Sequence, residues 1–414
     1  MIRISTSTLA KSIFSLMLFS STLSQAQEQD SLNTKKNNQD PSDMNMDAAF
    51  NKPFLTGDKS PVTLGGYIEA NSIYSTEEGV SDGLAFQARR LSLFMSANIA
   101  KRISFMTELE IEDGGEEMAI EFAAVDVALD PLLNFRGGIV MNPIGAFNQN
   151  HDGPKWEFVE RPDMAVNMLA ATLSNAGFGA YGKTYSGNWI FGYETYITNG
   201  FDNTIISNEE DKTYLPNAKE NPDRFMENHS GKATFTGKLS IKNRNLGEIG
   251  ISYMGGTYNK TEDDGEEIED KARLDVFALD FNTTIQATNT RIIGEAAWTW
   301  IDMPSTYTEQ YGEKQFGAFI DVVQPLYQSK VLEWENASLN FAARFDYVDW
   351  NIGKFDETGT KIGDERIAVT PALSFRPTPG TVFRINYRYQ WDTDVMRNPA
   401  EQTATWYFGF STYF

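Results

Sequence analysis

Apolar and polar residues alternate along much of the chain, and the last twelve residues show this pattern most clearly. One face of that stretch carries Ala404, Trp406, Phe408, Phe410, Thr412 and Phe414, while polar or small residues lie between them. A period of two predicts a β-strand, and an unpaired apolar strand invites aggregation in a soluble protein. Closure into a transmembrane barrel removes that edge, because barrel strands alternate lipid-facing apolar and lumen-facing polar residues.

Segments of the same kind recur from residue 62 to the C-terminus, separated alternately by short and long connections. We predict strands at 62–74, 84–100, 102–113, 118–129, 133–142, 173–185, 188–198, 231–242, 248–258, 273–284, 290–302, 314–323, 337–350, 365–376, 381–391 and 402–414. An even number of strands with this alternation is typical of bacterial outer-membrane barrels. The sequence therefore predicts an all-β membrane protein, a closed antiparallel transmembrane β-barrel of about 16 strands spanning residues 62–414.

The long connections predict which side of the membrane each end of the barrel faces. Residues 199–230, 259–272, 303–313 and 351–364 are hydrophilic and largely acidic, as extracellular loops are. The connection 324–336 falls among the short periplasmic turns but is longer than they are. A soluble β-sandwich or propeller would also alternate, but it would not explain this spacing together with the apolar chain end.

The N-terminus carries an export signal. Arg3 and Lys11 precede an apolar run at 13–23 and small residues that end at Ala26, so residues 1–26 are predicted to be a signal peptide. Residues 27–61 form a polar periplasmic leader, with one more apolar island at 44–55. We expect that island to be part of an unstructured linker, a short helix docked on the barrel mouth, or a contact for a periplasmic partner.

Composition narrows the class further. The formal net charge is −22, which argues against nucleic acid as a partner. The chain has no cysteine, which excludes disulfides and thiolate metal sites. No stretch of about eighteen consecutive apolar residues exists, so any membrane crossing must use strands. The expected location is the outer membrane of a Gram-negative bacterium, with the lipid bilayer, lipopolysaccharide and the barrel assembly machinery as partners.

The connection at residues 143–172 is the third outer loop and the candidate functional site. We expect it to fold into the lumen and narrow it, although a solvated surface loop is the alternative. Asp163 is a possible N-cap for a helix at 164–171. Mixed charge beside aromatic residues suits a constriction that sorts solutes, and the loop supplies Asn148, His151, Lys155, Trp156, Glu157, Glu160 and Arg161.

The strands add charged side chains that should face the lumen. Inward bases are Arg90, Arg136, Lys232, Lys238, Arg344, Arg376, Arg384 and Arg388, and inward acids are Glu69, Glu108, Glu110, Glu112, Asp126, Asp280, Glu295, Asp321 and Asp346. The two signs nearly balance. They form either opposed walls with a transverse field, in which Arg161 and Lys155 face Glu108 and Glu110, or neutralising pairs that brace the wall.

Catalytic chemistry is not expected. The two histidines, His151 and His229, lie in loops at spacings that match no zinc site or catalytic triad. Residues 261–267 resemble a calcium loop, but lysines stand where the first and last acidic ligands belong. We therefore predict no enzyme activity, no metal and no cofactor, and leave open only a barrel hydrolase with a histidine at its rim.

Several short motifs resemble successive landmarks of the phosphate-selective porin O and P family. They are Phe86-Gln87-Ala88-Arg89-Arg90-Leu91, Gly138 with Pro143 and Gly145, Phe158-Val159-Glu160-Arg161, Asn199-Gly200, and the late hairpin from Phe375. The chain end resembles the assembly signal of outer-membrane barrels, with Trp406, Phe408, Gly409, Phe410 and Phe414 in place.

This resemblance implies a sixteen-stranded outer-membrane porin, often trimeric, that passes small solutes or ions by passive diffusion along a basic path. Family members carry a basic residue in the stretch matched by residues 139–142, where this chain has Met141. A mixed-charge lumen is therefore expected here instead of a phosphate-selective one. The rival hypothesis is a barrel that does not conduct and serves as a subunit or scaffold of an outer-membrane complex.

Overall fold

The structure of the protein, a computed structural model, describes residues 44–52, 62–210, 212–304, 307 and 312–414. The chain divides into residues 1–43 and residues 44–414. The predicted signal peptide, residues 27–43 and residues 53–61 lie outside the described residues, so the boundaries of the leader stay predictions.

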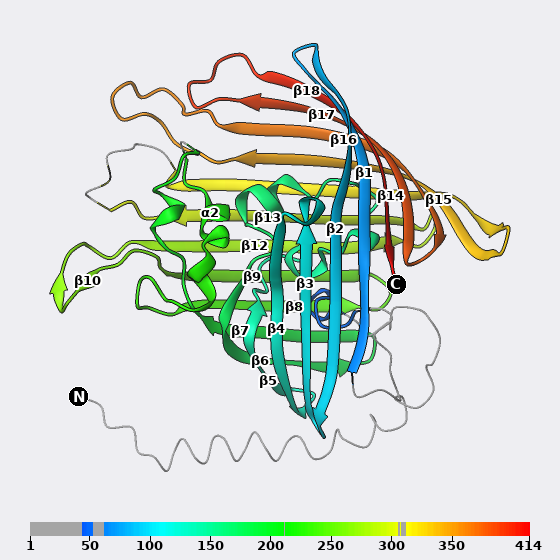
Figure 1. Ribbon diagram of the computed structural model, residues 1–414, viewed down its shortest axis with the longest axis horizontal. Coiled ribbons are helices and arrows are strands. Elements are labelled where there is room, and N and C mark those ends of the chain that lie inside the picture. The colour runs from blue at the N-terminus through cyan, green and yellow to red at the C-terminus, as the bar shows by residue number, and fades with distance from the viewer. Residues whose placement is uncertain (1–43, 53–61, 211, 305–306, 308–311) are drawn as a thin grey trace. The chain divides into compact units, whose positions relative to one another are not determined.

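The strands between residues 62 and 413 close into one antiparallel barrel (Figure 1). Its members are β1 (Val62–Glu77), β2 (Val80–Ala100), β3 (Ile103–Glu112), β4 (Glu117–Asp130), β5 (Leu133–Met141), β6 (Ser174–Ser186), β7 (Trp189–Thr198), β8 (Thr234–Asn243), β9 (Gly247–Thr257), β12 (Arg273–Ile285), β13 (Thr290–Ile301), β14 (Lys314–Val331), β15 (Trp334–Asp349), β16 (Glu365–Thr378), β17 (Thr381–Thr393) and β18 (Glu401–Tyr413). Each strand pairs with the next barrel strand in the chain, and β18 closes the ring on β1. The predicted sixteen-stranded barrel is confirmed.

Few regular elements lie outside the barrel among the described residues. Strands β10 (Glu262–Asp263) and β11 (Glu266–Glu267) form a separate two-stranded hairpin. The connection between β7 and β8 contains helix α2 (Leu215–Glu220). The described residues contain no helix that is long and apolar enough to cross a bilayer.

Two connections differ from the sequence prediction because strands continue further than expected. β1 and β2 are joined by Glu78 and Gly79 alone, so the first outer loop is only a tight turn. The long connection expected at 324–336 is wrong, since β14 and β15 run through it to a turn at Leu332. The pairing shifts register beside Pro325, and a bulge is where a strand tolerates proline. Every connection at the barrel end that holds Val62 and Phe414 is therefore a short turn.

Burial along the strands is inverted relative to a soluble protein. In β8, Thr236, Lys238 and Ser240 are buried, whereas Leu239 and Ile241 are 67% and 47% exposed. Strands β7, β16 and β17 repeat this pattern of buried polar and exposed apolar side chains. An apolar exterior around a polar interior is the arrangement of a barrel in lipid.

The chain end completes the barrel seam. Phe414 exchanges backbone hydrogen bonds with Gly66, at 3.0 and 3.1 Å. A Cβ atom on Gly66 would lie 2.8 Å from the Phe414 ring, so the terminal ring packs directly over this glycine. Trp406 and Phe408 point outward and are 44% and 46% exposed. The last strand thus has no free edge, as the sequence pattern required.

The lipid-facing surface gives a direct stability prediction. We expect Phe408→Arg to destabilise the barrel by about 2–4 kcal/mol, because a charge near the membrane midplane loses its hydration. Met396→Arg is the control, since Met396 is 72% exposed in the connection before β18. Urea unfolding of both variants in lipid vesicles measures the difference. Equal stability of the two would show that Phe408 does not face lipid.

Candidate constriction site

The connection between β5 and β6, residues 142–173, crosses the inside of the barrel; we call it loop L3. Near its start, the Gly145 amide donates to Ser252 Oγ of β9 at 2.9 Å. Eight residues later, the Gly153 carbonyl accepts a hydrogen bond from Arg384 of β17. A Cβ atom on Gly153 would meet Glu69 of β1 at 2.5 Å. Because β1 and β9 lie opposite each other in the ring, the predicted inward fold of this loop is confirmed.

Wall arginines hold the backbone of L3 in place. Arg384 donates to the carbonyls of Gly153 and Phe158, and Arg376 donates to that of Pro154 at 2.8 Å. Arg344 donates to the Glu160 carbonyl at 2.8 Å. A buried loop must satisfy its backbone polar groups without a sheet or helix ladder. Guanidinium groups that reach in from the wall meet that need here.

The helical turn expected at 164–171 forms only at Met164–Met168, as a π-helix. Asp163 precedes it but makes no side-chain cap, so that expectation is wrong. Its carboxylate pairs with Arg388 and lies 3.6 Å from Arg366, and these charges outcompete the backbone amides.

The sequence predicts that the connection at 199–233 is hydrophilic, but the connection also buries apolar side chains. Ile205 and Leu215 are fully buried and join Met164 and Met168 in the largest apolar cluster. This connection therefore packs onto L3 and helps to fix it, in addition to exposing its acidic residues.

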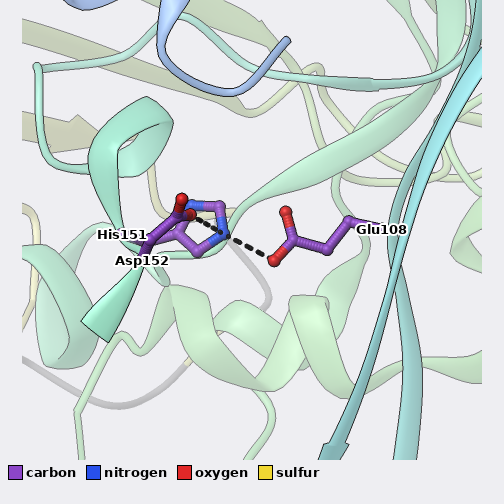
Figure 2. Close-up of side chains that lie close together, drawn as sticks. All are labelled: Glu108, His151 and Asp152. Carbon is purple, nitrogen blue, oxygen red and sulfur yellow. Dashed lines mark hydrogen bonds and ion pairs between the residues drawn. The ribbon is translucent and has the colours of Figure 1, made fainter. Parts of the chain in front are cut away.

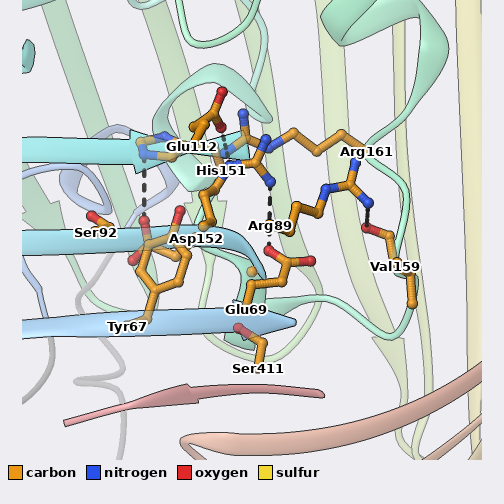
Figure 3. A network of polar contacts seen from close by, with 12 residues as sticks. Tyr67, Glu69, Arg89, Ser92, Glu112, His151, Asp152, Val159, Arg161 and Ser411 are labelled. Carbon is orange, nitrogen blue, oxygen red and sulfur yellow. Dashed lines mark hydrogen bonds and ion pairs between the residues drawn. The ribbon is translucent and has the colours of Figure 1, made fainter. Parts of the chain in front are cut away.

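A network of charges joins L3 to β1, β2 and β3 (Figure 3). Arg90 lies 3.5 Å from Glu69 and 3.2 Å from Glu110, and it also pairs with Glu112. Arg161 of L3 reaches Glu110 at 3.5 Å, as the sequence suggested. The candidate residues on L3 and on the wall thus meet in one buried network.

Two further residues of L3, Glu160 and Lys155, also form ion pairs. Arg89 binds both carboxylate oxygens of Glu160, at 2.7 and 2.8 Å. Burial raises the pKa of Glu160, but Arg89 outweighs it and holds the pKa at about 2. Lys155 makes its ion pair with Asp152, at 3.7 Å. Burial lowers the pKa of Lys155 more than Asp152 raises it.

Glu108, His151 and Asp152 come together at the centre of the site (Figure 2), and their ligand atoms lie within 4.8 Å of one another. Such a cluster has donors suitable for a metal ion, which the sequence did not suggest. Lys52 occupies it instead, with Nζ 2.7 Å from Glu108 and 2.5 Å from Asp152. Burial lowers the pKa of Lys52, but Asp152 and Glu108 outweigh it and leave the pKa raised.

The remaining candidate side chains are also paired across the lumen wall. Arg136 contacts Asp126 and Glu194, and Arg344 contacts Asp321. The other pairs are Lys238 with Asp280, Arg388 with Asp346, and Glu157 with Arg376 and Arg291. Glu295 instead accepts hydrogen bonds from the amides of Ala146 and Phe147 on L3. Lys232 is the exception, because it lies before β8 and is half exposed beside Glu262.

Two cavities near L3 differ greatly in volume. A cavity of about 400 Å³ lies on the long-loop side, where Tyr214, Trp350, Arg366 and Asp392 contribute to its lining. Beside L3, between Glu69, Trp156 and Arg161, a cavity of about 10 Å³ remains. That is room for about one water molecule. The cavity that borders L3, β1 and β17 is therefore small, and L3 packs closely against the wall there.

Comparisons with known proteins agree with this architecture. The sequence profile of the phosphate-selective porin O and P family matches residues 62–324. An uncharacterized protein of Aquifex aeolicus (strain VF5) is 31% identical over 210 residues, and the match spans 49% of this chain and 46% of that relative.

Three solved porins share the fold at 10% sequence identity. The anion-selective porin from Comamonas acidovorans has a TM-score of 0.53, over 85% of this chain and 99% of its own. OprB of Pseudomonas putida has a TM-score of 0.53, over 86% and 94%. Salmonella typhi OmpF, in a complex with daunomycin, has a TM-score of 0.52, over 85% and 97%.

Proposed function

The chain belongs to the phosphate-selective porin O and P family, and we propose that L3 selects which small hydrophilic solutes and ions diffuse through this outer-membrane porin. Membership of this family points to a channel of the Gram-negative outer membrane, and we propose that the protein is not an enzyme. We propose no catalytic residue, and we propose that residues 1–26 direct export and residues 27–61 form the leader. Trimer formation, as the family resemblance implies, is also a proposal.

The observation that carries this proposal is the passage of L3 from one wall of the lumen to the other. A solute that passes L3 meets Arg161 and Glu110 within 3.5 Å of each other. Water is scarce there, so both charges act on the solute with little screening. Closely spaced charges of opposite sign favour zwitterions and polar neutral solutes such as sugars over a single ionic sign.

Phosphate selectivity is not part of the proposal. Met141 stands in the stretch where family members carry a basic residue, and here its side chain is fully buried beside Met106 and Phe122. An apolar side chain offers phosphate neither charge nor a hydrogen bond.

Conductance of the purified protein in planar bilayers tests the proposal. We expect Arg161→Glu to shift the reversal potential under a salt gradient toward cation preference, because the variant replaces the positive charge next to Glu110. The conductance itself should change little, since glutamate is no larger than arginine and does not narrow the path. Arg244→Glu makes the same charge change in an exposed turn outside the lumen, and should leave the reversal potential unaltered. Identical behaviour of the two variants would show that ions do not pass Arg161.

One observation favours the rival function of a non-conducting subunit or scaffold. The cavity beside L3 has room for about one water molecule, and residues 44–52 lie inside the barrel as well. Absence of current both from the intact protein and from variants that free the lumen would support a scaffold.

A further inference from the structure

The second occupant of the lumen is the segment of residues 44–52, which we call the inner segment. It contains a single 3-10 turn, Asn45–Asp47, and pairs with no strand. Its contacts run along the wall from β12 round to β2, about half of the ring. The segment therefore lies across the barrel, and side-chain contacts are what hold it.

One end of the inner segment binds near the short-turn end of the barrel. The Asn45 amide donates to Glu248 of β9 at 3.0 Å, and its side chain contacts Asp280 and Asn282 of β12. Asp47 pairs with Lys183 of β6 at 2.5 Å. Glu248 is the second residue of β9, and Asn282 and Lys183 lie three residues before the ends of β12 and β6, so all three lie beside short turns. The segment therefore lies on the opposite side of L3 from the long loops.

The same end of the segment also fits an apolar part of the wall. Met44 and Met46 are buried against Ile190 of β7. A Cβ atom on Gly192 would lie 2.5 Å from the Met46 sulfur and 2.9 Å from the Met44 sulfur. Any larger residue at position 192 would displace both methionines, so this glycine creates the space that they fill.

Further along, Ala49 and Phe50 continue this fit. Phe50 lies 4.9 Å from the Phe122 ring and 3.3 Å from the Arg136 guanidinium. Ala49 is fully buried with Phe122 and Met141. Met141 lies in the stretch where family members carry a basic residue. Here it packs against the inner segment and is not available to a solute.

Lys52 fixes the other end through charge. Its ammonium binds Glu108 and Asp152 and lies 4.5 Å from the Phe94 ring. The side chains of the lysine and of both acids are 0% exposed. Removal of the ammonium would take away the cation that the two buried carboxylates share and leave them with hydrogen bonds from Ser92 and Tyr413 and the ion pair with Lys155. Loss of that cation strongly disfavours the bound state.

Loop L3 forms the other side of this binding site. Gln149 lies 3.4 Å from the Met46 carbonyl, and Asn150 donates to the Asn45 carbonyl at 3.2 Å. The segment is therefore enclosed between L3 and the wall, where it fills the lumen that a solute would need after passing L3.

We propose that the inner wall from β12 to β2, together with L3, is a binding site for a short peptide, and that its occupant is the chain's own inner segment, which closes the pore. Release of residues 44–52 toward the short-turn end opens the path past L3. This inference rests on the proposed diffusion function for its effect on current, but not for the binding site itself.

Two variants release the segment from opposite ends and leave the walls of the barrel in place. Lys52→Ala removes the ammonium, and Gly192→Leu fills the space of Met44 and Met46. We expect each to raise the open probability in planar bilayers on the order of a hundredfold. Lys330→Ala is the matched control, because Lys330 lies exposed in the hairpin of β14 and β15 and pairs only with Glu335 among the described residues.

A second readout follows the segment without any current. The chain has no cysteine, so Ala49→Cys places one thiol at a fully buried site. A membrane-impermeant maleimide should label it slowly in the otherwise unchanged, folded protein. Lys52→Ala or Gly192→Leu should speed this labelling on the order of a hundredfold. Met226→Cys, at a position 83% exposed, gives the rate of a free thiol.

The two readouts separate the possible failures. Labelling of Cys at position 49 as fast as at position 226 would overturn the proposal, as would unchanged labelling and current in both release variants. Faster labelling in both variants with no current from any protein would uphold the peptide site and refute the diffusion function instead.

Discussion

Replacement of residues 144–171 by a two-residue Asn-Gly turn is expected to raise the single-channel conductance severalfold. Met141 and Ser174 are register partners, so a tight turn can join β5 to β6 without altering either strand. The change removes the segment that crosses the lumen between β9 and β1. It also removes Asp152 and Gln149, which hold the inner segment, so both obstructions are weakened together.

Ion preference should weaken in the same variant, because the remaining wall charges are hydrated in a wider lumen. Arg384 and Arg376 lose their carbonyl partners on L3 but gain water, and the barrel should still migrate as a folded species. The control replaces part of the connection 259–271, which holds the β10–β11 hairpin outside the barrel, and should leave conductance unchanged. A loop-deleted barrel with the conductance of the intact protein would show that L3 is not the constriction.

The alternation of residues is sufficient to predict the barrel. Each strand has apolar residues on the face toward lipid and polar or small residues on the face toward the lumen. Leu239 and Phe408 are exposed and apolar, and every second position beside them is buried or small. Where the local signal is mixed, the prediction was wrong. Residues 324–336 contain proline and several polar side chains, which predict a loop, yet they pair as strands on either side of the turn at Leu332.

The candidate site was only partly predictable, for a physical reason. Mixed charge identified L3, but its partners depend on where the loop lies after folding. Glu108 and His151 are 43 residues apart in the chain and meet only because L3 turns inward. Asp163 has the sequence signature of an N-cap, but in the folded protein its carboxylate pairs with Arg388 and not with a backbone amide.

The role of the inner segment was beyond sequence reasoning for the same reason. The sequence marks residues 44–55 as an apolar island, and it is compatible with a linker, a docked helix and a partner contact alike. The acids nearest to Lys52 in the sequence are Asp47 and Asp58, not the Glu108 and Asp152 that bind it, and Gly192 has no turn to explain it. Only the closed barrel brings Glu108 and Gly192 to opposite ends of one binding site.

The pair of Arg344 and Asp321 gives the largest stability effect that we expect from a single substitution. The two residues face each other across β14 and β15, and Arg344 donates to both carboxylate oxygens at 2.6 and 2.7 Å. Arg344 and Asp321 are 2% and 1% exposed. The same guanidinium also donates to the Glu160 carbonyl and lies 4.3 Å from the Phe158 ring, so it joins the wall to L3.

Arg344→Met should therefore destabilise the barrel by about 3–5 kcal/mol, because it leaves the Asp321 carboxylate buried without its cation. Arg273→Met breaks a half-exposed pair with Asp275 and should cost no more than about 1 kcal/mol. The double variant Asp321→Leu with Arg344→Leu should recover most of the loss, since replacing both partners by apolar groups removes the unpaired charge. Urea midpoints at unchanged m-value measure all three free energies of unfolding. Equal losses for Arg344→Met and Arg273→Met would mean that water reaches Asp321, and that the lumen beside L3 is open instead of packed.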